Sequence, residues 1–203
     1  TIFDPALAVA LPDWVRFGTA LRCVEHAVGA VTHPKATDEI RTLALQGLRI
    51  AHRGITAMVD APASNAAMID VYTGGWMAVR ALNTGGCYPA IGHLIENQYS
   101  ARYGVHQGAC SGVLCARILA YHHDASAAHQ AQLVHALTAD NETGAATDQL
   151  SAARLVTKLV NRLPGVAKDH ADTGTVDAAT LRAFAESLPL ARLSTLSPKP
   201  FAS

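Results

Sequence analysis

Hydrophobic residues recur every three or four positions along most of the chain, which is the spacing of one face of an α-helix. In the first such segment the apolar face consists of Trp14, Phe17, Leu21, Val24 and Val28. The same spacing returns in every later segment of comparable length. The pattern therefore predicts helices over residues 12–31, 37–58, 64–85, 89–102, 108–121, 124–137, 147–163 and 177–188.

Helix-start residues support these boundaries. Pro12 suits the first turn of a helix, and Thr37 precedes Asp38 and Glu39, an N-cap followed by acidic residues near the positive end of the helix dipole. Only residues 1–11 are compatible with extended structure, and two short extended pieces cannot form a sheet by themselves. We expect an extended lead-in over 1–11, an irregular tail over 193–203, and a single all-α domain, a multi-helix bundle, spanning residues 1–203.

Composition narrows the function classes. The 203 residues carry 16 Lys or Arg and 16 Asp or Glu, so the formal net charge is zero. A protein that binds nucleic acid through phosphate contacts needs a basic face. The zero net charge therefore excludes this class of nucleic-acid-binding protein. No uninterrupted apolar stretch approaches the length of a membrane span, and no basic leader precedes the first segment, so we expect a cytoplasmic protein. The four cysteines show no zinc-type spacing and are expected to be buried thiols.

Charged residues make up only 16% of the chain, whereas hydrophobic residues make up 50%. The average for globular domains is about 25% charged, so little charge remains to cover the surface of a monomer. We therefore expect an apolar face that is covered by a second copy of the chain or by a separate partner subunit.

Two predicted helices each carry a stripe of polar residues beside an apolar one. Arg22, Glu25 and His26 lie three and four positions apart on the first, and His93, Glu96 and Asn97 do so on the fourth. Each stripe is explained equally well as a solvated face. Alternatively, the two stripes face one another across a cleft, where two imidazoles and a carboxylate could bind a metal or move a proton.

The segment from Arg102 to Gly108 is predicted to be a turn that enters a helix. Backbone N–H groups at such a start can hold an anion, but a plain interhelical turn explains the segment better. The chain contains no glycine-rich nucleotide-binding motif.

At these residues the sequence resembles the iron-containing alcohol dehydrogenases, and more closely their maleylacetate-reductase-like branch. The similar segments are TIFDPALAVALP at the start, LRCVEHAVGAV over 21–31, GHLIENQYSARYGVHQGACSGVL over 92–114 and SPKPF over 197–201. The resemblance follows the chain in order and covers the helical C-terminal domain of that family. It implies that the Rossmann-like domain, which binds the nicotinamide in the family, is absent from this sequence.

The resemblance also implies a degenerate metal site. Family members that use a metal hold it with an Asp and a His four positions apart and with two further His. His26 and His93 match two of these positions, but Arg22 stands at the Asp position and Gln107 at the last His. A further active-site His is replaced by Asn97. Two imidazoles beside an arginine cation would bind a divalent metal poorly, so we expect neither metal nor nicotinamide on this chain.

These observations lead to three hypotheses. The first is a repurposed enzyme without metal or nicotinamide that isomerises, dehydrates or cyclises a small polyfunctional carbonyl or carboxylate compound in biosynthesis. The second is the helical subunit of a split NAD(P)-dependent oxidoreductase, and the third is a small-molecule-binding or scaffold protein without activity. For the first, the predicted catalytic residues are Arg22, Glu25, His26 and His93, and the predicted substrate-binding residues are Glu96, Asn97, Arg102, Tyr103 and Gln107.

Overall fold

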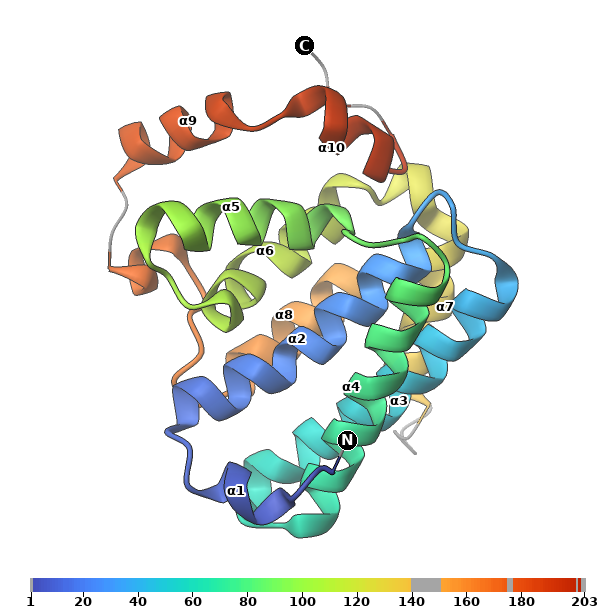
Figure 1. The fold of residues 1–203 in the computed structure, drawn as a ribbon, viewed down its shortest axis with the longest axis vertical. Helices are drawn as coiled ribbons and strands as arrows, with labels where there is room; N and C mark the ends of the chain where they lie inside the picture. The colour runs from blue at the N-terminus through green and yellow to red at the C-terminus, as the bar shows by residue number, and fades with distance from the viewer. Residues whose placement is uncertain (1, 140–150, 175–176, 200, 202–203) are drawn as a thin grey trace.

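The computed structural model describes residues 2–139, 151–174, 177–199 and 201, and every regular element in these ranges is helical (Figure 1). The all-α prediction is therefore confirmed. The α-helices are α1 (Pro5–Val9), α2 (Asp13–Thr32), α3 (Asp38–Asp60), α4 (Asn65–Thr84), α5 (Ile91–Tyr103), α6 (Gln107–Tyr121), α7 (Ala127–Thr138), α8 (Ala152–Arg162), α9 (Ala178–Ser187) and α10 (Leu190–Leu196). Two short 3-10 helices, η1 (Asp124–Ser126) and η3 (His170–Thr173), lie between them.

Helix α2 runs through the middle of the bundle (Figure 1). It packs against the α3–α4 pair and against α5, α6 and α7. Its side chains are buried on more than one face for this reason, and Phe17, Leu21 and Val24 are completely inaccessible to solvent. Helices α5 and α6 pack together, and α10 packs on α5. This arrangement brings α5 alongside the centre of α2.

Local capping explains where several helices begin. The side chains of Thr37, Ser64 and Asp177 each accept a hydrogen bond from a backbone N–H in the first turn of α3, α4 and α9. These contacts satisfy donors that a helix start leaves without a partner. At the other end of α5, Gly104 has φ = +67°, a left-handed conformation that ends the helix and favours glycine.

The two predicted irregular ends are partly helical, which corrects the sequence-based boundaries. Residues 5–9 form α1 rather than an extended lead-in, because Asp4 accepts a hydrogen bond from the Ala6 N–H and Pro5 occupies the first turn. Helix α10 runs to Leu196, so the expected irregular tail begins four residues later than predicted. The helix expected from residue 124 begins at Ala127 instead, after η1. The start of the helix expected over 147–163 lies outside the described residues.

Helices α3 and α4 approach so closely that no side chain fits at Gly74. A Cβ built on Gly74 would lie 2.4 Å from the carbonyl oxygen of Gly47 and 2.5 Å from the backbone nitrogen of Ala51. Both atoms belong to the backbone of α3 and cannot rotate away, so the helices themselves must move.

We expect Gly74→Ala to lower the free energy of unfolding by about 2 kcal/mol, the usual cost of overpacking a core. Thermal or urea unfolding measures the loss. The neighbouring Thr73 is exposed on the same helix, so Thr73→Ala is a matched control and should change stability by less than about 0.5 kcal/mol. Equal stability of the two variants would contradict the close helix approach.

All four cysteines are unpaired thiols, and Cys87, Cys110 and Cys115 are buried. Burial raises the pKa of the Cys110 thiol to about 12, so this cysteine behaves as a small hydrophobic residue, as the sequence predicts. Among the described residues, no helix combines the length and the apolar character needed to cross a membrane.

Candidate active site

The two polar stripes face one another, because α5 lies against α2. Arg22 of α2 donates from Nη1 to Oε2 of Glu96 on α5, at 2.8 Å. The side chain of Glu96 is 0% exposed and that of Arg22 is 13% exposed, so the ion pair is largely removed from water. The two stripes thus face one another rather than solvent, and this ion pair joins them directly, whereas the sequence-based hypothesis placed them on opposite sides of a cleft.

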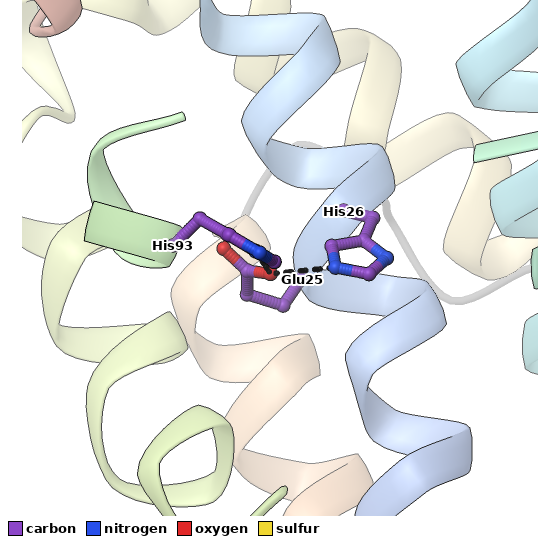
Figure 2. A group of neighbouring side chains, drawn as sticks. All are labelled: Glu25, His26 and His93. Atoms are coloured by element: carbon purple, nitrogen blue, oxygen red, sulfur yellow. Dashed lines mark hydrogen bonds and ion pairs between the residues drawn. The ribbon is translucent and has the colours of Figure 1, made fainter. Parts of the chain in front are cut away.

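Glu25, His26 and His93 complete what we call the polar cluster, which consists of Arg22, Glu25, His26, His93 and Glu96. Oε2 of Glu25 lies 3.5 Å from Nδ1 of His93 and 3.7 Å from Nε2 of His26; Figure 2 shows the carboxylate between the two rings. The ring centroids of the histidines are 4.9 Å apart. A Cβ at Gly92 would lie 2.6 Å from Oε1 of Glu25, so glycine at this position leaves room for the carboxylate.

The guanidinium of Arg22 contacts both imidazoles. Its Nη2 is 3.3 Å from Nε2 of His26, and 3.4 and 3.5 Å from Nδ1 and Nε2 of His93. Because Arg22 has only donors, a ring nitrogen that bonds to it must carry a lone pair. The contact with His26 therefore favours the tautomer in which Nε2 carries no hydrogen.

Burial changes the protonation of the cluster. It lowers the pKa of His26 to about 4, helped by the positive charge of Arg22 and opposed by Glu25, so His26 is neutral at neutral pH. Burial, reinforced by the negative charge of Glu25, raises the pKa of Glu96 well above its usual range, although Arg22 and Ser111 oppose the change. Two carboxylates and one guanidinium therefore share a site that is largely removed from water.

The other predicted substrate-binding residues divide into two groups. The Gln107 side chain donates to Oδ1 of Asn97 at 2.7 Å, so these two amides bond to one another at the edge of the cluster. Arg102 instead donates to the Ser187 hydroxyl at 2.9 Å, and Tyr103 packs against Tyr99 and Phe184. The structure thus places Arg102 and Tyr103 against α9 rather than in the polar cluster.

Ser111 is a member of the site that sequence reasoning missed. Its hydroxyl donates to Oε1 of Glu96 at 2.8 Å, and both residues are completely buried. Ser111 lies four positions after Gln107 on α6, so the same helical spacing that identified the other stripes could have found it.

An apolar pocket of about 370 Å³ reaches the polar cluster. Arg22 and His26 contribute to its wall, while Phe3, Leu11, Met58, Met68, Val71, Tyr72, Trp76 and Val79 contribute apolar surface. Four of these, Phe3, Leu11, Trp76 and Val79, are also between 39% and 50% exposed. The mouth of the pocket is therefore surrounded by the apolar surface that the low charge content predicts.

The metal that the family resemblance implies does not fit these residues. The Arg22 guanidinium lies within 3.5 Å of a ring nitrogen of each imidazole that would bind the metal, and it already supplies a positive charge there. Gln107, at the position of the last ligand, is bonded to Asn97. A dication beside a guanidinium would meet strong repulsion in a buried site.

Comparisons with known proteins agree with the fold. A profile described as "Fe-containing alcohol dehydrogenase family, C-terminal" matches residues 6–202. Maleylacetate reductase 1 of Rhodococcus opacus is 27% identical over 104 residues, which make up 51% of this chain and 29% of that protein. Maleylacetate reductase of Pseudomonas knackmussii is 28% identical over 81 residues, or 40% of this chain and 23% of that protein.

Solved structures cover the chain almost completely. Maleylacetate reductase from Rhizobium sp. matches 99% of this chain and 53% of its own, at 21% identity and a TM-score of 0.79. An iron-containing alcohol dehydrogenase from Corynebacterium glutamicum matches 99% of this chain and 52% of its own, at 17% identity and a TM-score of 0.84. The chain thus spans about half the length of these structures and shares their helical fold.

Proposed function

Because this chain belongs to the Fe-containing alcohol dehydrogenase family, as its C-terminal helical domain, we propose that it is the helical half of a nicotinamide-dependent carbonyl reductase. The observation that carries the proposal is the Arg22 guanidinium, which lies at the wall of an apolar pocket and contacts two imidazoles, of which His26 also lines the pocket. The curated relatives are named as reductases. They favour this function over the metal- and nicotinamide-independent isomerase, dehydratase or cyclase that the sequence suggested first.

The nicotinamide is held by a unit outside these 203 residues. The described residues contain no strand, so they cannot form the strand–turn–helix that binds a dinucleotide. The exposed apolar residues around the pocket are suited to contact such a unit. Covering them would also close the pocket to water, which strengthens the interactions of a buried charge.

The residues of this chain orient and polarise the substrate. The bound nicotinamide would supply the hydride, which adds to the carbonyl carbon and leaves negative charge on its oxygen. Arg22 donates a hydrogen bond to that oxygen and so stabilises the charge as it develops. His26, neutral and at the pocket wall, gives the proton of its Nδ1–H to the oxygen, and water returns a proton to the same nitrogen, because the Nε2 lone pair accepts from Arg22. The product is the alcohol. The pocket wall is largely apolar, and Arg22 and His26 are among its few polar residues. It therefore favours a small substrate whose carbonyl and carboxylate oxygens lie against Arg22 and whose carbon chain lies against the apolar wall.

An affinity-tagged chain, purified from its own cells, tests the proposal. We expect it to bring with it a nucleotide-binding polypeptide, or to occur as part of a longer chain, and the preparation should oxidise NADH or NADPH when maleylacetate is added. The isolated 203 residues should not do so. Arg22→Lys keeps the charge but loses the planar arrangement of donors, and it should lower kcat/KM by about 100-fold.

Arg182 is an exposed arginine on α9, and Arg182→Gln is the matched control that should leave kcat/KM unchanged. Reduction by the isolated chain would contradict a separate nicotinamide-binding unit. Saturable binding of the carbonyl compound without turnover in any preparation would indicate a binding protein. Conversion without nicotinamide would restore the non-redox hypothesis.

A further inference from the structure

The Arg22 guanidinium contacts two of three neighbouring side chains that could serve as metal ligands. One ligand atom from each of Glu25, His26 and His93 lies within 4.8 Å of the others, and Figure 2 shows a ring nitrogen of each histidine facing the Glu25 carboxylate. Nη2 of Arg22 lies within 3.5 Å of both imidazoles. The positive charge at this point is thus supplied by the chain itself.

The distances from the Glu25 carboxylate to the two imidazoles are close to those between ligands in tetrahedral coordination. Donor atoms about 2.1 Å from a zinc ion stand about 3.4 Å from one another in a tetrahedron. The Glu25 carboxylate lies 3.5 Å from the His93 ring nitrogen and 3.7 Å from that of His26. Small side-chain movements would therefore place all three at ligand distance from one ion.

We propose that Arg22 acts as a built-in replacement for a metal ion, and that Glu25, His26 and His93 form a transition-metal site that the guanidinium masks. The carboxylate ligand of this site is Glu25. It differs from the family pattern, in which the carboxylate occupies the position of Arg22. Asn97 and Gln107 take no part, because they bond to one another. Two imidazoles and a carboxylate suit Zn²⁺ or Co²⁺.

Removing Arg22 alone would leave Glu96 buried without its partner, so the test uses the double variant Arg22→Met/Glu96→Gln. It deletes both charges of the ion pair and keeps an acceptor for the Ser111 hydroxyl. Far-UV circular dichroism and thermal melting check that it folds. Arg22→Gln/Glu96→Gln, which retains polar groups at both positions, is the second variant.

Co²⁺ is the probe, because its visible absorption reports tetrahedral coordination. We expect the double variant to bind one Co²⁺ at least about 100-fold more tightly than the unmodified chain, and Zn²⁺ to displace it. Adding His93→Ala should abolish the absorption. Arg41→Met is the matched control, since the Arg41 side chain is also 13% exposed and paired with an acidic residue; it should bind no more Co²⁺ than the unmodified chain.

Two results would overturn the proposal. One is tight binding of a single Co²⁺ by the unmodified chain that His93→Ala removes, because the guanidinium then does not mask the site. The other is a folded double variant that binds Co²⁺ no better than the unmodified chain. Neither result bears on the reductase function, which is measured by NADH or NADPH oxidation.

Discussion

Arg22→Met is expected to lower the free energy of unfolding at pH 7 by about 3–5 kcal/mol, the usual cost of breaking a buried ion pair from one side. The loss of stability is large because the buried Glu96 carboxylate remains without its cationic partner. Glu96 is 0% exposed, and without Arg22 its carboxylate keeps only the Ser111 hydroxyl as a donor. The methionine fills much of the volume, so the cost reports the orphaned charge rather than a cavity.

A double-mutant cycle separates these contributions. Glu96→Gln in the Arg22→Met background should recover at least about 2 kcal/mol in urea unfolding, because the buried charge is then absent. The loss in Arg22→Met alone should also shrink at pH 5, where Glu96 escapes its cost by binding a proton. If the single and double variants were equally unstable at both pH values, the ion pair would not be the cause.

Acidification from pH 7 to pH 4 should remove about 3 kcal/mol of stability through His26 alone. The pKa of His26 is about 4 in the folded chain, against an ordinary value of 6.5. The unfolded chain therefore binds a proton below pH 6.5, whereas the folded chain does not do so until about pH 4. The stability is fully present above pH 6.5 and is lost as the pH falls through this interval, at about 1.4 kcal/mol for each unit of pKa difference.

Urea unfolding at several pH values measures this dependence. His26→Asn removes the titrating group, so its stability should fall less steeply than that of the unmodified chain between pH 6.5 and pH 4. Some slope remains, because burial also lowers the pKa of His33 and His122. His135 is exposed on α7, and His135→Asn should keep the full slope. Identical profiles for the unmodified chain and His26→Asn would show that His26 is not buried as a neutral imidazole.

Most of the helices could be predicted because their signals are local. The 3.6-residue spacing needs only about four turns of sequence, and an N-cap such as Thr37 or Ser64 acts on the N–H groups of its own first turn. Helix α1 was not predicted, because its signal is too short. Its five residues are too few for the spacing to repeat, so only the Asp4–Pro5 start indicated it.

The candidate site was predictable only as two separate stripes. Spacing placed Arg22, Glu25 and His26 on one face, and His93 and Glu96 on another. A helix carries no information about what lies opposite it, so solvent and a facing helix were equally good explanations. The same limit applies to Asn97 and Gln107. The sequence predicted that both bind substrate, whereas in the structure their side chains hydrogen-bond to one another.

The sequence by itself determined most of the helices, the neutral charge balance, the family resemblance and the presence of an arginine where a metal ligand would stand. All of these depend on residue identity and on spacing along a single segment. Only the tertiary structure decided that α5 lies against α2, which removes Glu96 from water, lowers the pKa of His26 and places the Arg22 guanidinium in contact with two imidazoles. Burial and the proximity of charges depend on how distant segments pack together. Arg22 and His93, for example, are in contact although they are 71 positions apart along the chain, and no local pattern encodes such a contact.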